Sequence, residues 1–209
     1  MANSARLREH WQAISSQFDR PYRGNPFSPR VSYGRHRGPA PSSSHPAAVL
    51  MAILPAPSGW VIPLTLRPAT MADHAGQVSF PGGRCEPGES PGQAAWREYT
   101  EELGCPSEPV EVIGSLPALY VFASRHRVVP ILGIASEYPA MQPNPDEVSQ
   151  VLLLPIEHLM RLEPAVRTVQ RGAMQVEALG FWLEGHWVWG ATAIMLAELK
   201  IRLKRISLA

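Results

Sequence analysis

Apolar residues change their spacing several times along the chain, and each spacing predicts a different element. Near the N-terminus they recur every three or four residues, at Leu7, Trp11, Ile14 and Phe18. This spacing predicts an amphipathic helix. Continuous apolar runs then occupy 47–54 and 60–67, separated by the turn sequence PAPSG, and they predict a β-hairpin.

Strand-like and helical patterns alternate through the rest of the chain. Strands are expected in PVEVIGSL, LYVF, RVVPILGIA, EVSQVLLLP, AVRTVQ, MQVEAL and an aromatic hairpin, FWLEGHWVW. Helices are expected over 91–103, over 156–162 and in the C-terminal segment ATAIMLAELKIRLKRI. Helices interspersed with mostly antiparallel strands favour an α/β fold in which a mixed sheet is covered on both faces.

The length of 209 residues is enough for one hydrophobic core, and we expect a single folded domain over 45–209. Residues 1–44 are expected to add the N-terminal helix and a connector rich in proline, glycine and arginine. The connector has one acidic residue, Asp19, and its arginines are Arg20, Arg23, Arg30, Arg35 and Arg37. It is either a solvated linker or a cationic flap over a polyphosphate ligand.

Composition excludes several classes of function. The 19 basic and 18 acidic residues leave a formal net charge of +1, which does not favour nucleic acid as a partner. The two cysteines, Cys85 and Cys105, form neither a disulfide framework nor the Cys-x-x-Cys pair of a zinc site. The N-terminus lacks the apolar stretch of a signal peptide, and no run is long enough to span a membrane. We therefore expect a cytoplasmic protein with no membrane partner.

Candidate chemistry is concentrated in one segment, GRCEPGESPGQAAWREYTEELGC, at 83–105. Ser90 as the N-cap, Pro91 at the first helical position and Gln93 completing a capping box predict the start of a helix. Gly104 predicts its end. The acidic residues of the segment are Glu86, Glu89, Glu98, Glu101 and Glu102.

Three of these glutamates lie on one side of the predicted helix. At about 100° per residue, Glu98, Glu101 and Glu102 fall within one sector, beside an apolar sector that would pack into a core. Carboxylates this close repel one another, as Glu98 and Glu102 do at i,i+4. A solvated acidic face is the ordinary explanation of such a stripe. The alternative is a bound divalent cation, and hard carboxylate oxygens suit Mg²⁺ or Mn²⁺ rather than zinc.

Spacing within the segment decides between these explanations. The pattern G-x5-E-x7-R-E-U-x-E-E-x-G-U is matched at Gly83, Glu89, Arg97, Glu98, Glu101, Glu102 and Gly104. Such a match arises by chance on the order of a few times per billion windows. The chain therefore resembles the Nudix hydrolase family. It departs from the family at the two U positions, where Tyr99 and Cys105 replace the usual aliphatic residues.

The resemblance implies a fold and a reaction. Nudix hydrolases form an α/β/α sandwich and use divalent metal and water to cleave a nucleoside diphosphate linked to another group. Carried over to this sequence, the resemblance implies metal ligands at Glu98, Glu101 and Glu102, with the carbonyl of Gly83 as a further ligand.

Two further roles follow from the same resemblance. Arg97 would pair with Glu89 and brace the loop against the helix. The general base differs among Nudix enzymes, and its candidates here are Glu98, Glu101 and Glu147, the last in the segment NPDEVSQV.

The segment before the acidic one indicates a subfamily. PLTLRPATMADHAGQVSFPGG, at 63–83, resembles the motif L-L-T-x-R-[SA]-x3-R-x3-G-x3-F-P-G-G of coenzyme A pyrophosphatases. It departs from the motif at Pro63, Pro68 and Ala72, and an arginine at the last of these could bind phosphate. Residues 185–193 resemble the W-G-x-T-A segment of the same subfamily.

Substrate contacts are expected from five residues: Arg67, His74, Gly76, Phe80 and Arg125. His74 contacts phosphate or is a hydrogen-bonded structural histidine. Arg125 begins the basic triplet Arg125, His126 and Arg127, which binds a 3′-phosphate or is a solvated strand end.

The sequence thus predicts a Mg²⁺- or Mn²⁺-dependent hydrolase whose substrate is coenzyme A or a derivative. The products would be adenosine 3′,5′-bisphosphate and 4′-phosphopantetheine or its acyl form. One alternative is the same reaction on ADP-ribose, NADH or a dinucleoside polyphosphate. The other is a Nudix module that binds a nucleotide without cleaving it, against which the complete set of glutamates argues.

Overall fold

The computed structural model describes residue 9 and residues 40–71, 74–105, 110–171 and 174–207. The expected N-terminal helix and most of the connector lie outside the described residues, and so does Ala72. The first half contains β1 (His45–Ala56), β2 (Gly59–Leu66), β3 (Val78–Ser79), β4 (Gly82–Arg84), α2 (Pro91–Leu103), β5 (Val110–Ser115) and β6 (Leu119–Val121). The second half contains β7 (His126–Ala135), β8 (Gln150–Pro155), α3 (Ile156–Arg161), β9 (Ala165–Arg171), β10 (Met174–Leu183), β11 (His186–Trp189) and α4 (Gly190–Ser207).

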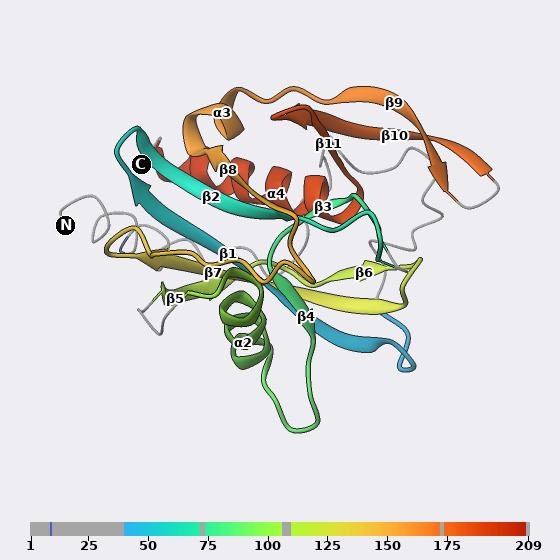
Figure 1. Ribbon diagram of the computed structural model, residues 1–209, viewed down its shortest axis with the longest axis horizontal. Coiled ribbons are helices and arrows are strands. Elements are labelled where there is room, and N and C mark those ends of the chain that lie inside the picture. Colours follow the sequence, from blue (N-terminus) through green and yellow to red (C-terminus); the bar gives the residue numbers. More distant parts are fainter. Residues whose placement is uncertain (1–8, 10–39, 72–73, 106–109, 172–173, 208–209) are drawn as a thin grey trace.

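β1 is the central strand of a mixed sheet (Figure 1). It runs parallel to β7 and antiparallel to both β2 and β4. β3 and β8 join β2, while β5 and β6 join β7, so that within the described residues the sheet has eight strands. The expected hairpin of the first two strands is confirmed.

Both faces of β1 are buried, which explains its almost continuous apolar sequence. Alternate residues face opposite sides, because the side-chain period of a strand is two. Leu50 and Leu54 pack with Tyr99 and Leu103 of α2, whereas Met51 and Ile53 belong to a second core that includes α4. In Figure 1, α2 lies below the sheet and α4 above it. The α/β/α arrangement is therefore confirmed.

A second sheet of three antiparallel strands, β9, β10 and β11, lies on the α4 side. The sequence suggested two separate pieces, MQVEAL and FWLEGHWVW, but β10 runs unbroken from Met174 to Leu183. Gly180 lies inside this strand, at a point where the neighbouring strand leaves no room for a side chain. A Cβ there would be 2.3 Å from the carbonyl oxygen of Val188. The glycine permits a close strand contact and does not mark a turn.

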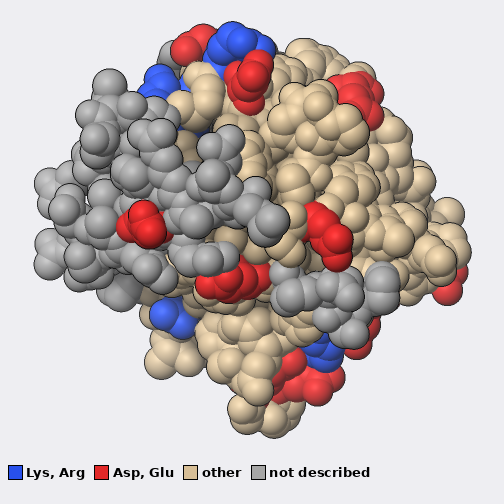
Figure 2. All heavy atoms as spheres, turned by 90° about the vertical axis from the view of Figure 1, so that its left-hand side faces the viewer, with Lys and Arg blue, Asp and Glu red and all other residues tan. Residues whose placement is uncertain are grey.

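Charged side chains are dispersed over the face shown in Figure 2, with Lys and Arg interspersed among Asp and Glu. No helix of the described residues is long and apolar enough to cross a membrane.

Candidate active site

The helix that carries the glutamates, α2, has caps at both ends that follow from its sequence. The Ser90 hydroxyl accepts the backbone N–H of Gln93 at 3.4 Å, and the Gln93 side chain accepts the backbone N–H of Ser90 at 3.0 Å. The predicted capping box is confirmed. Gly104 ends the helix in the left-handed conformation, with φ of 58°. The caps fix where the helix begins and ends, and so they place Glu98, Glu101 and Glu102 in its last two turns.

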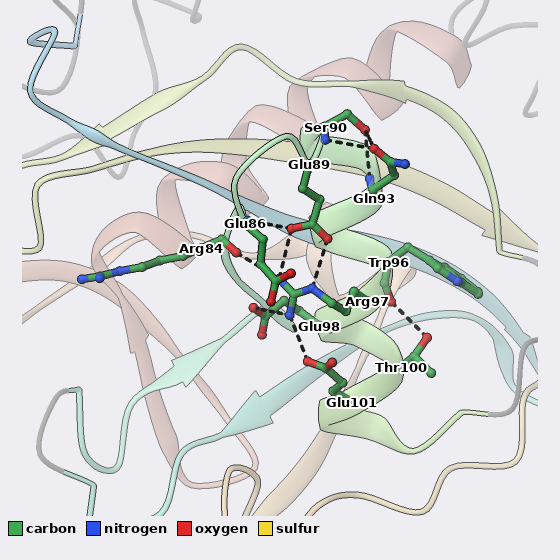
Figure 3. A network of polar contacts seen from close by, with 10 residues as sticks. All are labelled: Arg84, Glu86, Glu89, Ser90, Gln93, Trp96, Arg97, Glu98, Thr100 and Glu101. Atoms are coloured by element: carbon green, nitrogen blue, oxygen red, sulfur yellow. Dashed lines mark hydrogen bonds and ion pairs between the residues drawn. The ribbon is translucent and has the colours of Figure 1, made fainter.

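Arg97 is the centre of a polar network between α2 and the preceding loop (Figure 3). Its Nε and Nη2 donate to the two carboxylate oxygens of Glu89 at 3.0 and 3.2 Å, a bidentate pair. Nη2 also donates to the carbonyl oxygen of Arg84 at 3.0 Å. Nη1 donates to Glu98 and Glu101, each at 3.0 Å. One guanidinium thus joins the end of β4, the loop and the acidic side of the helix.

Glu98 lies against the backbone of Gly83. A Cβ added to Gly83 would be 2.3 Å from Oε1 of Glu98, so the carboxylate occupies the space that any other side chain would fill. Glu98 is 17% exposed at its side chain. Burial raises its pKa, an effect that the hydrogen bond from Arg97 opposes.

Glu102 lies deeper, one helical turn further on, and is 3% exposed. Its Oε1 accepts the backbone N–H of Gly82 at 3.4 Å. Burial raises the pKa of Glu102 to about 7, and the neighbouring Glu98 and Glu147 add to the rise. The Gly82 hydrogen bond and the charge of Arg67 act in the opposite direction. A buried carboxylate with two acidic neighbours is stabilised in its charged form by an added cation.

Glu147 comes from the loop between β7 and β8. Two backbone hydrogen bonds attach this loop to the end of α2: Gln142 N–H to Leu103 O at 2.8 Å and Asn144 N–H to Glu102 O at 2.9 Å. The Asn144 side-chain amide then donates to Oε1 of Glu147 at 3.3 Å. A residue 45 positions after Glu102 in sequence is thereby placed beside it.

Glu98, Glu102 and Glu147 form the acidic cluster of this site. Each offers a carboxylate oxygen, and these oxygens lie within 4.8 Å of one another. Hard divalent cations bind such oxygens at about 2.0 to 2.6 Å, so one ion can reach all of them. The donor set and the repulsion between its members fit a divalent cation.

A family model described as the NUDIX domain matches residues 45–175. The chain belongs to the Nudix family. It is 32% identical over 182 residues to an uncharacterized Nudix hydrolase, NudL, of Yersinia enterocolitica, and the match covers 84% of this chain and 92% of that relative. It is 36% identical over 161 residues to NudL of Escherichia coli K12, covering 75% and 82%. The protein is a Nudix hydrolase, an enzyme of the pyrophosphohydrolase type.

Solved structures agree with this fold. A Nudix hydrolase from M. smegmatis, RenU, gives a TM-score of 0.53 at 18% identity, covering 79% of this chain and 88% of that one. The MutT protein from Methanosarcina mazei Go1 gives a TM-score of 0.52 at 17% identity, covering 79% and 99%.

The position of Glu101 differs from the grouping expected on the helical wheel. Its side chain is 54% exposed and pairs with Arg97, and among the described residues the acidic cluster contains Glu147 in its place. A helical wheel contains no information about which edge of a sector meets another part of the chain. Asn144, which orients Glu147, was not expected from the sequence either, and the turn sequence NPDE was its only signal.

Arg67 and Gly76 close the base of the loop that joins β2 to β3. Arg67 N–H donates to the carbonyl oxygen of Gln77 at 3.0 Å, and Gly76 N–H donates to that of Arg67 at 3.2 Å. Gly76 has φ of 66°, the left-handed conformation that favours glycine. His74 lies at the tip, exposed, with Nδ1 3.0 Å from the side-chain oxygen of Gln77.

Phe80 and Arg125 occupy contrasting environments. Phe80 is 1% exposed and packs in the core on the α4 side, so it supports the segment before β4 and offers no face to a ligand. Arg125 is exposed in the turn between β6 and β7, with φ of 57°.

Proposed function

We propose that this Nudix hydrolase cleaves the diphosphate of coenzyme A or one of its derivatives. The products are adenosine 3′,5′-bisphosphate and 4′-phosphopantetheine, or the acyl form of the latter. The observation that carries the proposal is the position of Arg67, the arginine that matches the coenzyme A pyrophosphatase motif.

Arg67 stands at the end of β2, close enough to Glu102 for its charge to lower the pKa of that carboxyl. Its Nε is buried and has no hydrogen-bond partner among the described residues. A buried guanidinium N–H without a partner is costly, and a phosphate oxygen would satisfy it. Arg67 is therefore suited to bind the diphosphate next to the acidic cluster.

The second segment that resembles the subfamily also lies near this one. Thr192, within the W-G-x-T-A segment, donates its hydroxyl to the carbonyl oxygen of Val78 at 3.0 Å, and it is 6% exposed. Val78 belongs to the segment 63–83. The two stretches that resemble coenzyme A pyrophosphatases are thus hydrogen-bonded across 114 positions of sequence, which supports reading them as parts of one site.

Glu98, Glu102 and Glu147 would hold the divalent cation, Mg²⁺ or Mn²⁺. The chemistry supplied by a bound cation is neutralisation of charge on the diphosphate and polarisation of the attacking water. Gly82 donates its N–H to Glu102, and Gly83 leaves room for Glu98, so β4 sets the positions of two ligands. Glu101 would keep Arg97 oriented toward Glu98.

Glu147 is the candidate for the general base that the contacts favour. Arg97 donates to both Glu98 and Glu101, so an arginine already occupies part of each of these carboxylates. The hydrogen bond to Glu147 comes from the neutral amide of Asn144 instead. Among the described residues no guanidinium contacts Glu147, so this carboxylate can orient a water molecule without competition from an arginine.

Chromatographic product analysis tests the substrate. Purified protein is incubated with coenzyme A, dephospho-coenzyme A, ADP-ribose or NADH, each with and without Mg²⁺ or Mn²⁺. The proposal predicts metal-dependent release of adenosine 3′,5′-bisphosphate, fastest with coenzyme A. Faster cleavage of ADP-ribose or NADH would assign the enzyme to that alternative substrate.

Two variants accompany this assay. Glu102→Gln keeps the size of the side chain and removes a metal ligand, so the rate should fall at least about 100-fold. Glu157→Gln, at an exposed ion pair on α3, is the matched control and should retain the wild-type rate. Wild-type activity in Glu102→Gln would contradict the role of the acidic cluster.

A further inference from the structure

A group of basic side chains lies where β4 ends and where β1 and β7 begin. His45 and His126 are paired across the parallel strands, and their ring centroids are 5.7 Å apart. Arg84 is the last residue of β4 and is paired with Ala47 of β1. Because residues two apart on a strand share a face, all of these side chains lie on the side of the sheet that faces α4. We call His45, Arg84 and His126 the basic cluster.

One hydrogen bond orders the basic cluster and leaves several donors free. Nε of Arg84 donates to Nε2 of His126 at 2.9 Å. His126 therefore carries its proton on Nδ1 when it is neutral. The two Nη groups of Arg84 have no hydrogen-bond partner among the described residues, and they point outward from a side chain that is exposed.

Acidic groups do not offset these charges. Among the described residues, no carboxylate forms an ion pair with Arg84 or His126. Burial, Arg84, His45 and His74 all lower the pKa of His126. An arriving anion would offset the charge of Arg84 beside the His126 imidazole.

The basic cluster is joined to the acidic cluster by two segments. Along β4, Gly82 donates to Glu102, Gly83 lies against Glu98, and the next residue is Arg84. The loop at 67–77 makes the second connection. It begins at Arg67, whose charge acts on Glu102, and it carries His74, whose charge acts on His126.

We propose that His45, Arg84 and His126 form a subsite for a phosphate monoester carried by the same molecule whose diphosphate is cleaved at the acidic cluster. The inference deepens the proposed function, and it rests on that proposal for the identification of coenzyme A as the substrate. The chemical class is broader, a nucleoside diphosphate derivative with an additional phosphate on its ribose.

A phosphate monoester matches the donors of this subsite. It has a charge of about −1.5 to −2 at neutral pH and three acceptor oxygens. The planar guanidinium of Arg84 can bind two of them, and the N–H of His126 can bind another. A diphosphate already held beside the acidic cluster has no such free monoester, so the subsite distinguishes substrates that carry one.

Calorimetric titration tests the subsite without turnover. The probes are adenosine 3′,5′-bisphosphate and AMP, which differ by one phosphate monoester, and the proteins are wild type, Arg84→Gln, His126→Gln and Arg161→Gln. Arg161 forms an exposed ion pair on α3 and serves as the control. The wild type and the control should bind the bisphosphate at least about tenfold more tightly than AMP, and both cluster variants should lose most of that preference.

Equal affinities in the wild type, no binding of the bisphosphate, or a preference that persists in both cluster variants would overturn the subsite. Each variant's unfolding midpoint is measured to show that the variant is folded. The comparison of the two probes on the wild type tests the subsite without any variant. The turnover assay keeps the two proposals separate. Cleavage of coenzyme A without the binding preference would remove the subsite alone, whereas the preference without cleavage of coenzyme A would remove the substrate assignment alone.

Discussion

The carboxylate of Glu98 fills the space beside Gly83 that a side chain at position 83 would occupy. A Cβ on Gly83 would lie 2.3 Å from Oε1 and 2.4 Å from the carboxylate carbon of Glu98. Real Cβ atoms do not approach other heavy atoms so closely, so a Cβ at this position would displace the Glu98 carboxylate. The first glycine of the Nudix pattern thus acts through the position of a glutamate, not through an unusual φ angle.

The first prediction concerns this contact. Gly83→Ala should displace Glu98 from the acidic cluster and reduce kcat/KM at least about tenfold, because a misplaced ligand weakens metal binding. Gly92→Ala is the matched control, since a Cβ at that helical position meets nothing within 4 Å. Steady-state kinetics over a range of Mg²⁺ concentrations measures the effect. A Gly83→Ala enzyme with wild-type kcat/KM and metal dependence would contradict the role assigned to the contact.

The local parts of this site could be predicted from sequence, because they depend on residues close together in the chain. Ser90, Gln93 and Gly104 specify the ends of α2 through contacts within a few positions. The pairing of Arg97 with Glu89, which the resemblance to Nudix hydrolases implies, spans only eight positions. Where a contact joins residues that are close in sequence, the spacing of residue types along the chain is enough to predict it.

A second prediction follows from Glu102 and concerns pH. Its pKa is about 7 in the folded protein, above the value of 4.5 for a free glutamate, so the folded state holds a proton that the unfolded state releases. Stability from this group is fully present below pH 4.5 and is lost as pH rises through 7. The shift corresponds to about 3 kcal/mol of unfolding free energy.

Urea unfolding with EDTA at pH 5 and pH 8 measures this dependence. The wild type should lose stability between the two values, and Glu102→Gln should lose much less, since glutamine does not titrate. Saturating Mg²⁺ should restore part of the wild-type stability at pH 8. Equal pH dependence in the wild type and the variant would refute the assignment.

The third prediction addresses the brace formed by Arg97. Arg97→Lys keeps the charge and removes the bidentate bond to Glu89 as well as the bond to the Arg84 carbonyl. Unfolding free energy should fall by about 1 to 2 kcal/mol, and kcat/KM should fall at least about tenfold. Arg161→Lys, at an exposed pair with Glu157, should change neither quantity appreciably. If both variants behave alike, Arg97 contributes only a surface charge.

The fourth prediction concerns the junction between α2 and the loop that carries Glu147. Gly104 has φ of 58°, and a Cβ there would lie 2.0 Å from the carbonyl oxygen of Gln142. Gly104→Ala should therefore lower stability by more than about 2 kcal/mol, the strain of the φ angle and the clash adding together. Activity should also fall, because the same junction positions Glu147.

Gly185→Ala isolates the contribution of φ, since its φ is 82° and a Cβ meets nothing within 4 Å. This control should cost about 1 kcal/mol and leave the rate unchanged. An equal cost for the two variants, measured by urea unfolding, would show that Gln142 moves away without consequence.

Contacts that join distant parts of the chain could not be predicted in the same way. Glu147 could be nominated from its segment, but its place beside Glu102 depends on hydrogen bonds from Gln142 and Asn144 to the end of α2. The short strands β3 and β4 carry only Val78–Ser79 and Gly82–Arg84, and a pair of glycines is typical of a turn. Their pairing is imposed by β1 and β2, to which they are hydrogen-bonded.

The basic cluster shows the same limit. Arg84 and His126 are 42 positions apart, and no local pattern joins them. Sequence alone marked the triplet Arg125 to Arg127 as basic. The register of β1 with β4 and β7 selects His126 from that triplet and adds Arg84 and His45.

The central claim is that Glu98, Glu102 and Glu147 together hold the divalent cation on which hydrolysis depends. The most direct measurement is an anomalous difference map from crystals of the full chain soaked in MnCl2. The account predicts a peak within about 2.0 to 2.6 Å of a carboxylate oxygen from each of these glutamates. A peak held by Glu98, Glu101 and Glu102 without Glu147, or no peak near α2, would contradict it.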